Sequence, residues 1–342
     1  YNNLRNNFSM PIHHFIVGRR QSEAGQMKSL SRFAGDYVHF ARALRGNNVD
    51  VVHINPSLDL KSFIRDGLFV VLAKSFGKKV VVFFHGWQKP FQEKIESHYL
   101  WTFRRLFGRA DAFVVLSNEV MNTLRRWSLT QPIYKETTVI DDHDLDGFDL
   151  EKTLEARGRS PAWRILFLSR VLRGKGVYET LEAFARLHAA CPAMELIVAG
   201  DGPELDNVKE RAAAQGVPRV TFPGYVKGAE KRRWLENAHV YILPSYSEGM
   251  PISVVEAMAF GLPIVTRPVG GLADLIRNEV HGFMTPSLDP AEFAGFLERL
   301  YREKAMYAAI SRNNWEYAQS HFLSSGAAAR LEAIYASLVQ TP

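Results

Sequence analysis

The sequence has almost no cysteine and no long apolar run, and each absence excludes a class of protein. Cys191 is the single cysteine among 342 residues, so no intramolecular disulfide can form and a reducing compartment is expected. No stretch reaches the roughly 18 to 20 apolar residues that span a bilayer. Low-complexity tracts and repeats of fixed period are also missing. We therefore expect a globular, cytoplasmic protein.

Acidic residues are too few to balance the basic ones. The 36 acidic and 42 basic residues give a net charge of +6. A surplus of this size attracts polyanions. Because no run of lysine and arginine stands out and the sequence has no nucleic-acid-binding motif, we predict no nucleic-acid partner. Phosphorylated substrates and an anionic membrane surface are the expected partners.

One helical segment combines apolar and basic side chains. It is "SHYLWTFRRLFGR", and its relevant residues are Trp101, Phe103, Leu106 and Phe107 with Arg104, Arg105 and Arg109. Such a helix favours the lipid interface, so we predict contact with the inner face of the cytoplasmic membrane. In the alternative, the aromatic side chains belong to the core and the arginines form a solvated rim.

Near-continuous Val/Ile/Phe runs alternate with helical segments in both halves of the chain. Such runs indicate strands buried on both faces, in a parallel sheet between helix layers. The strands are expected at 12–18, 50–57, 79–86, 111–117 and 136–140, and then at 163–169, 194–200, 219–224, 240–245 and 263–267. The polar stretch 141–160 is the predicted linker. The fold class is therefore α/β, with two Rossmann-like domains, 1–150 and 151–314, facing a cleft. The first domain apparently lacks its first strand and the glycine-rich turn that follows it.

The segment "YILPSYSEGMPISVVEAMAFGLPIV" carries the strongest chemical signal. A buried strand leads through a polar turn to Pro251 in the first turn of a helix. A helix N-terminus offers unpaired amides and positive potential to a phosphate. Glu248 lies in the turn, Glu256 about two turns along the helix, and Gly249 permits close approach of a ligand. In the alternative, Glu248 favours the helix start and Glu256 is a solvated surface residue.

Two further loops follow predicted strands. The loop "RVLRGKG" holds Arg170 and Lys175 between glycines, and such cations suit a diphosphate. Gly200 in "VAGDGP" and Gly224 in "FPGYV" permit close backbone approach at two more strand ends. A basic surface loop and ordinary turns are the alternatives.

Taken together, these motifs resemble the donor domain of glycosyltransferase family four, a family of retaining GT-B enzymes. "SRVLRGKG", "VAGDGP", "FPGYV", "PSYSEGMPISVVEAMAFGLPIV" and "VGG" lie in order between Ile165 and Phe283. The resemblance implies a nucleotide-sugar site in which Arg170 and Lys175 bind the diphosphate and Glu248 contacts the donor sugar. Amides of Gly249, Met250 and Pro251 lie near sugar and phosphate in such a site. Glu256 binds the ribose, and Tyr225, Val226 and Gly200 lie around the base. His85 in "FFHGW" matches a family histidine beside the donor sugar. In the alternative, it is a histidine satisfied by hydrogen bonds at a strand end. Helix 315–342 is expected to return to the first domain.

The resemblance also implies an activity. We expect transfer of a hexosyl unit, with retention, from a UDP- or GDP-type sugar to a glycan or lipid-linked glycan in cell-surface polysaccharide assembly. A non-hydrolysing sugar-nucleotide epimerase and a catalytically impaired donor-binding protein are the alternatives. No cofactor and no metal is predicted. Asp142, Asp144 and Asp146 match half of a calcium loop, but Thr153 stands where its bidentate glutamate belongs, so we expect a solvated linker.

Overall fold

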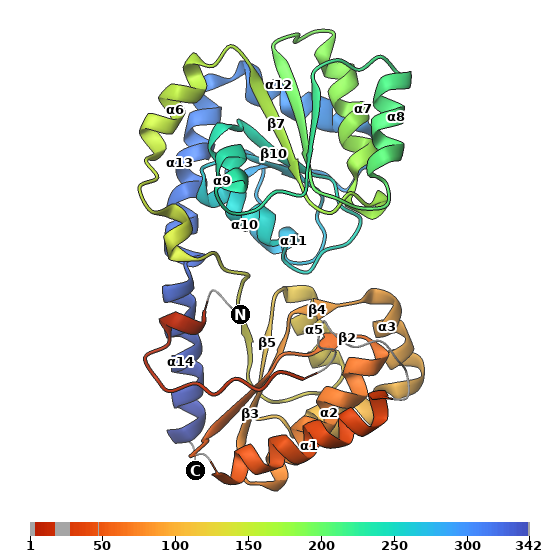
Figure 1. Cartoon of the computed structure of the whole chain (residues 1–342), viewed down its shortest axis with the longest axis vertical. Helices are drawn as coiled ribbons and strands as arrows, with labels where there is room; N and C mark the ends of the chain where they lie inside the picture. Colours follow the sequence, from red (N-terminus) through yellow and green to blue (C-terminus); the bar gives the residue numbers. More distant parts are fainter. Residues whose placement is uncertain (1–3, 18–27, 47, 341–342) are drawn as a thin grey trace. The chain divides into compact units, whose positions relative to one another are not determined.

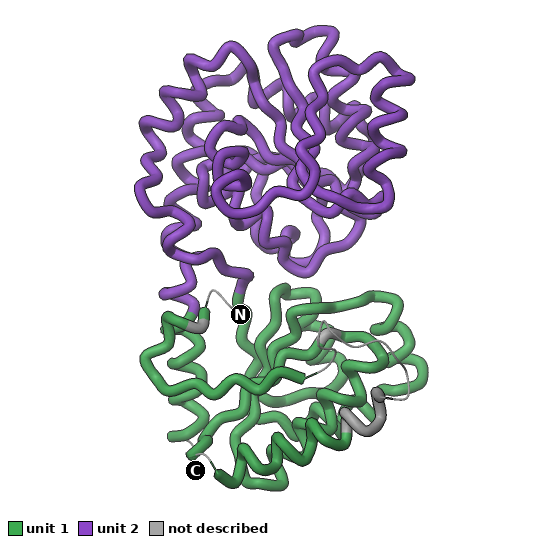
Figure 2. The backbone as a smooth tube through the Cα atoms, viewed as in Figure 1, with its two compact units in different colours: residues 1–136, 328–342 green, residues 137–327 purple. Residues whose placement is uncertain are grey.

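A computed structural model describes residues 4–17, 28–46 and 48–340. The chain divides into two compact units, Tyr1–Glu136 with Ala328–Pro342, and Thr137–Ala327 (Figure 2). The sequence placed these divisions near 150 and 315, whereas the structure places them after Glu136 and after Ala327. Each unit has its own parallel sheet and its own hydrophobic core, which confirms the predicted two-domain α/β fold.

Unit 1 is built on a four-stranded parallel sheet of order β1-β3-β5-β6 (Figure 1). These strands are β1 (Val51–Ile54), β3 (Lys79–Phe84), β5 (Ala112–Val115) and β6 (Ile133–Lys135), with a separate pair β2 (Ser57–Leu58) and β4 (Gly86–Trp87). The helices are α1 (Lys28–Gly46), α2 (Leu60–Ser75), α3 (Lys89–Lys94), α4 (Leu100–Leu106) and α5 (Asn118–Arg126). β3 and β5 are buried almost throughout, as their apolar runs predict.

Two of the strands expected in unit 1 are wrong. Residues 12–17 form no strand, because Phe15 anchors this segment by ring packing on Phe40 and Phe69 rather than by a backbone ladder. The last strand ends at Lys135, before the predicted 136–140. The Glu136 amide still donates to the Val115 carbonyl of β5 at 3.0 Å, but no regular strand continues beyond it, and the Glu136 carboxylate pairs with Arg330.

The predicted membrane helix is interrupted, and two of its aromatic side chains lie in the core. A π-helical turn, Ile95–Tyr99, precedes α4, and a 3-10 turn, Phe107–Arg109, follows it. Phe103 and Phe107 are fully buried, so their assignment to a membrane surface is wrong. Trp101 is 70% exposed. Among the described residues, no helix is both long enough and apolar enough to cross a bilayer.

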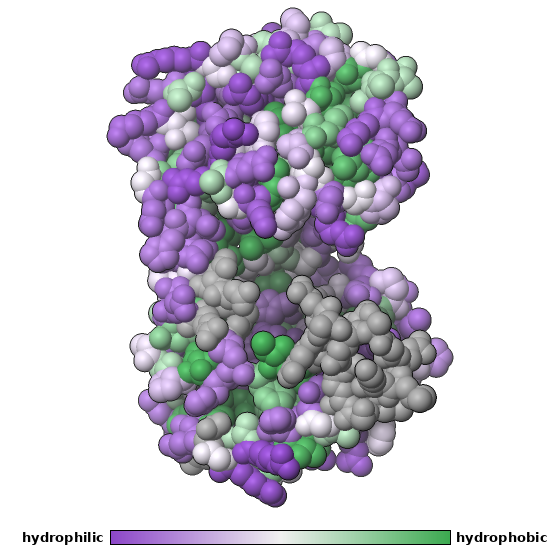
Figure 3. Space-filling view, in the orientation of Figure 1, coloured by the Kyte–Doolittle hydropathy of each residue, from purple (hydrophilic) through white to green (hydrophobic). Residues whose placement is uncertain are grey.

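Unit 2 is built on a six-stranded parallel sheet of order β12-β11-β10-β7-β8-β9. The strands are β7 (Trp163–Leu168), β8 (Met194–Ala199), β9 (Val220–Gly224), β10 (Val240–Leu243), β11 (Ile264–Thr266) and β12 (Gly282–Met284). Its helices are α6 (Leu150–Arg159), α7 (Val177–His188), α8 (Leu205–Ala214), α9 (Gly228–Asn237), α10 (Ile252–Ala259), α11 (Leu272–Leu275), α12 (Pro290–Arg302) and α13 (Lys304–His321). Helix α14 (Ser324–Gln340) begins in unit 2, and from Ala328 onward it belongs to unit 1. Pro223 lies in β9, an edge strand, where its missing N–H costs no central ladder bond. Figure 3 shows predominantly hydrophilic side chains over α6, as expected for an outer helix.

The strand order creates a switch point between β7 and β10. From β7 the chain steps outward to β8 and β9, and β10 then pairs on the other side of β7. The loops that follow β7 and β10 leave the same edge of the sheet, where open α/β sheets bind ligands. Gly176 (φ 76°) fits between them, since a Cβ there would lie 2.3 Å from the Pro244 carbonyl oxygen.

Candidate functional site

The loops after β7 and β10 interlock at the switch point. The Gly174 carbonyl accepts hydrogen bonds from the Tyr246 amide (2.9 Å) and the Ser245 hydroxyl (3.1 Å). Lys175 Nζ donates to Glu248 Oε1 at 2.6 Å. The Glu248 side chain is only 6% exposed and that of Lys175 25%. The structure therefore joins two predicted site residues in one mostly desolvated ion pair.

The start of α10 is arranged as a phosphate-binding end. Pro251 is the N-cap residue, one position before the first turn in which the sequence placed it, and no side chain caps the helix. The Gly249 carbonyl accepts from the Gly271 amide at 2.6 Å. Because the N–H of a trans peptide points away from its C=O, the Met250 amide faces the opposite side. This amide and the first amides of α10 are donors available to an anion, whereas the predicted donor at Pro251 is wrong because proline has no N–H.

Tyr241 fixes the first turn of α10 against the sheet. Its hydroxyl donates to the Leu168 carbonyl at 3.0 Å and lies 2.6 Å from the Ser253 hydroxyl. Burial raises the pKa of the Tyr241 phenol well above its usual value, so the hydroxyl remains a donor. One buried side chain thus links β10, the end of β7 and the helix N-terminus.

Glu256 forms a second buried ion pair. Its Oε1 accepts from Lys231 Nζ of α9 at 2.5 Å, and the Glu256 side chain is 8% exposed. Burial raises the pKa of Glu256, and the Lys231 ammonium partly offsets this rise. The sequence analysis missed Lys231. The available signal was the basic run "KRR" in the helix after "FPGYV".

The remaining predicted donor residues differ in exposure. Arg170 is exposed and pairs with no carboxylate in the described part of the chain. Tyr225 is 67% exposed, whereas Val226 is 5% exposed and its side chain packs in the core. Only the backbone of Val226 is therefore available to a ligand. Gly200 packs against the loop after β7, because a Cβ there would lie 1.8 Å from the Ser169 carbonyl oxygen.

His85 is the one predicted site residue in unit 1. It follows β3 and its ring stacks on Phe83, with centroids 3.7 Å apart. The residue is exposed. Its place beside a donor sugar stays a prediction.

The linker aspartates take part in hydrogen bonds that stabilise the local fold. Asp142 accepts from the Ser324 hydroxyl (2.8 Å) and the Ser325 amide (3.2 Å), and so caps α14. Burial raises the pKa of Asp142, but these hydrogen bonds outweigh it and the pKa is lowered. Arg232 binds the carbonyls of Asp144 and Asp146. The described residues contain no cluster of three or more His, Cys, Asp or Glu side chains suited to a metal ion.

Two family models match most of the chain. Residues 9–140 match "Glycosyltransferase Family 4", and residues 162–303 match "Glycosyl transferases group 1". The second match contains every site residue of unit 2 described above, and the first contains His85.

Curated relatives with these domains share limited identity. The alpha-D-kanosaminyltransferase of Streptomyces kanamyceticus is 24% identical over 241 residues, 69% of this chain and 62% of that protein. The putative colanic acid biosynthesis glycosyltransferase WcaL of Salmonella typhimurium is 26% identical over 252 residues, 70% of this chain and 60% of that protein. The chain thus spans about three fifths of the length of these two relatives.

Solved structures show the same fold. Anabaena Alr3699/HepE in complex with UDP and glucose matches with a TM-score of 0.68 and 19% identity, over 92% of this chain and 84% of that one. Sucrose-phosphate synthase from Thermosynechococcus elongatus matches with a TM-score of 0.74 and 18% identity, over 98% and 88%. The chain therefore has the GT-B fold and belongs to the glycosyltransferases of group 1 and family four.

Proposed function

We propose that this protein is a retaining glycosyltransferase that moves a hexosyl unit from a UDP- or GDP-type sugar to a glycan or lipid-linked glycan. The observation that carries the proposal is the Lys175–Glu248 pair beside the uncapped N-terminus of α10. It places a cation, a carboxylate and backbone amides at one switch point, as a sugar joined to a diphosphate requires. The name of WcaL, a putative colanic acid biosynthesis glycosyltransferase, supports polysaccharide biosynthesis as the process, and we propose cell-surface polysaccharide assembly in the cytoplasm as the setting.

The difficult step is cleavage of the bond between the anomeric carbon and the diphosphate oxygen. Negative charge develops on the diphosphate as it leaves, and fixed donors stabilise that charge most directly. Lys175, Arg170 and the amides of Met250 and the first turn of α10 take this role without a metal ion. Glu248 accepts hydrogen bonds from sugar hydroxyls, and Lys175 fixes its carboxylate. The acceptor hydroxyl oxygen then bonds to the anomeric carbon on the face that the diphosphate leaves, and its proton passes to the departing diphosphate oxygen.

The test combines binding with product analysis. Ligand-detected NMR with UDP- and GDP-sugars identifies the donor, and turnover is then followed with and without candidate acceptors. We expect acceptor-dependent product that persists in EDTA. A product formed from donor alone indicates an epimerase, and binding without any turnover indicates a donor-binding protein. Activity that EDTA abolishes and magnesium or manganese restores contradicts the metal-independent mechanism.

For the membrane partner, we infer that unit 1 contacts an anionic lipid surface through α2 and the exposed side of α4. Leu60, Ile64 and Leu68 recur every four residues on α2 and are 53%, 43% and 42% exposed. Helix α4, packed on α2 at Gly67, adds Trp101 with the Arg105 guanidinium 5.2 Å from its ring. An apolar stripe beside a cation and an aromatic ring suits the lipid interface.

A further inference from the structure

Arg157 is a buried cation on the opposite edge of the unit 2 sheet from the candidate site. It lies in the last turn of helix α6 and is 4% exposed, yet it forms no ion pair within the described part of the chain. Its Nε donates to the Glu236 carbonyl at 3.0 Å, and its Nη2 donates to the carbonyls of Leu235 (3.1 Å) and Phe260 (2.9 Å). One guanidinium therefore holds the carboxyl ends of α9 and α10 together.

Two helix ends compensate the charge of this guanidinium. The last carbonyls of a helix carry partial negative charge, and α9 and α10 both present theirs to Arg157. Burial lowers the pKa of Arg157, but a guanidinium remains cationic in proteins. The planar guanidinium bonds to carbonyls of two helices at once, whereas the ammonium of a lysine lacks that geometry.

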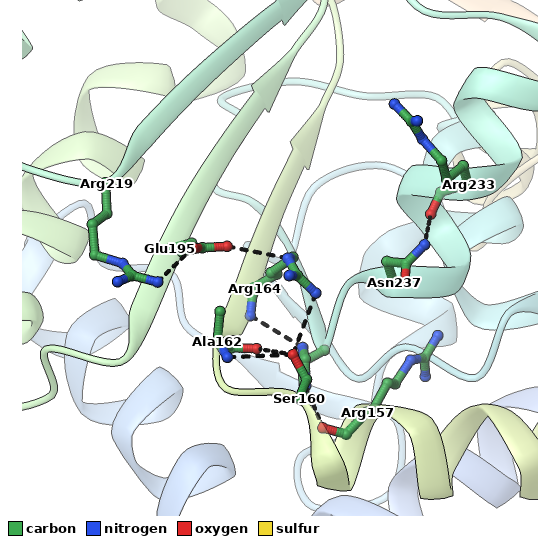
Figure 4. A network of polar contacts seen from close by, with 9 residues as sticks. Arg157, Ser160, Ala162, Arg164, Glu195, Arg219, Arg233 and Asn237 are labelled. Carbon is green, nitrogen blue, oxygen red and sulfur yellow. Dashed lines mark hydrogen bonds and ion pairs between the residues drawn. The ribbon is translucent and has the colours of Figure 1, made fainter.

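His239 fixes the backbone that carries Arg157. Its Nδ1 accepts from the Arg164 amide at 3.1 Å, so its Nε2–H donates to the Arg157 carbonyl at 3.0 Å. Burial lowers the pKa of His239 to about 3, which keeps the ring neutral and this arrangement intact. Figure 4 shows the same region, with Arg164 joined to Glu195 and to Ser160 of the turn after Arg157.

The anchored carbonyls lie one helical turn behind the Lys231–Glu256 pair. Leu235 follows Lys231 by four residues in α9, and Phe260 follows Glu256 by four in α10, where the Phe260 amide donates to the Glu256 carbonyl at 3.1 Å. One turn spans about 5.4 Å. If α9 slid or rotated against α10, the Lys231 ammonium would move away from the Glu256 carboxylate. By holding the two helix ends together, Arg157 prevents this movement.

We propose that Arg157 is a positioning residue for nucleotide binding, acting through the Lys231–Glu256 pair. This inference rests on the proposed function, in which Glu256 binds the ribose. Arg157 touches no ligand itself. It fixes the spacing of α9 and α10 at their carboxyl ends. Lys231 can then hold the Glu256 carboxylate in a position to accept hydrogen bonds from the ribose hydroxyls.

A double-mutant cycle in nucleotide affinity tests the inference. UDP and GDP are titrated calorimetrically into the wild type, Arg157→Lys, Lys231→Met and the double variant. Arg157→Lys, which keeps the charge, and Lys231→Met should each weaken binding by about three- to tenfold. In the Lys231→Met background, Arg157→Lys should add little, because the contact through which it acts is gone.

A matched control separates positioning from stability. Phe293→Leu alters a buried residue of α12, a helix that packs mainly on α7 and also on α13 and β11. It should lower the melting temperature yet leave nucleotide affinity unchanged. Additive losses in the cycle, an unaffected Lys231→Met, or equal weakening by Phe293→Leu each overturn the inference. A wild type that binds neither UDP nor GDP removes the proposed function instead.

Discussion

At the scale of single residues, two nearly buried glutamates each depend on one lysine. Removing one partner of such a pair leaves an uncompensated buried charge, which costs more than the pair contributes. The sequence predicted Glu248, Glu256 and Lys175 because strand-turn-helix patterns reveal where strands end. It did not predict Lys231, because its contact with Glu256 depends on how α9 packs beside α10. The spacing of residues along the sequence does not reveal such a contact between two neighbouring helices.

Lys175→Ala and Arg170→Ala should both weaken binding of the nucleotide sugar. The expected loss is about 1.5 to 3 kcal/mol for a charge-assisted hydrogen bond, with Arg170 at the lower end because it is solvated. Isothermal titration calorimetry with the donor measures the effect. Arg186→Ala, at an exposed position of α7, is the control. Unchanged affinity in both site variants removes the diphosphate assignment.

Glu248 and Glu256 should affect different kinetic constants. Glu256→Gln should mainly raise the KM for the donor, since ribose binding is the same in ground and transition states. Glu248→Gln should mainly lower kcat, because its carboxylate contacts the reacting sugar. Steady-state kinetics at saturating acceptor separates the two. The opposite pattern means that the roles are exchanged.

At the scale of elements, apolar runs located the buried strands well and the boundary segments poorly. The runs at β3, β5, β7 and β8 predict those strands because burial on both faces leaves a continuous apolar signal. Residues 12–17 and 136–140 carry similar residues, but ring packing of Phe15 and the Glu136–Arg330 pair decide their structure. Both are contacts with distant parts of the chain, which local periodicity does not encode.

The turn before α11 should tolerate no side chain at Gly270. Its φ is 53°, and a Cβ would lie 2.0 Å from the Glu248 carbonyl oxygen. Gly270→Ala should therefore displace the Glu248 loop and destabilise unit 2 by more than about 2 kcal/mol. Gly295→Ala is the control, since nothing lies within 4 Å of its Cβ in helix α12. That variant should gain about 0.5 to 1 kcal/mol. Denaturant unfolding of both variants checks the pair, and an equal response in the two contradicts the steric argument.

The His239 contact between α6 and β10 should make unit 2 sensitive to acid. Its folded pKa of about 3 lies below the ordinary value of 6.5, so the unfolded chain binds the proton first. The stabilising contribution is complete above pH 6.5 and is lost as the pH falls toward 3, by up to about 1.4 kcal/mol per pH unit. The stability difference between wild type and His239→Asn should thus be largest at neutral pH and smaller at pH 5. A difference independent of pH argues against a neutral buried ring.

At the scale of the whole molecule, the net charge of +6 favours association with anionic partners. The arginines of the predicted membrane helix do not act alike. Arg104 donates to the Trp127 carbonyl at 2.8 Å and so serves the fold, whereas Arg105 is exposed against Trp101. Exposed apolar and basic groups on one unit attract anionic lipid by about 1 kcal/mol for each basic residue near the surface.

Sedimentation with liposomes should therefore show binding to anionic vesicles and little to neutral ones, with less binding at high salt. Ile64→Glu and Arg105→Glu should each reduce binding, the first by putting a charge into the apolar stripe and the second by reversing a charge beside Trp101. Arg186→Glu changes the net charge by the same amount in unit 2 and should bind as the wild type does. Equal loss in Arg105→Glu and Arg186→Glu, which change the net charge by the same two units, means that net charge alone drives association. Equal sedimentation with neutral and anionic vesicles excludes an electrostatic membrane contact and leaves the positive charge to the phosphorylated substrate.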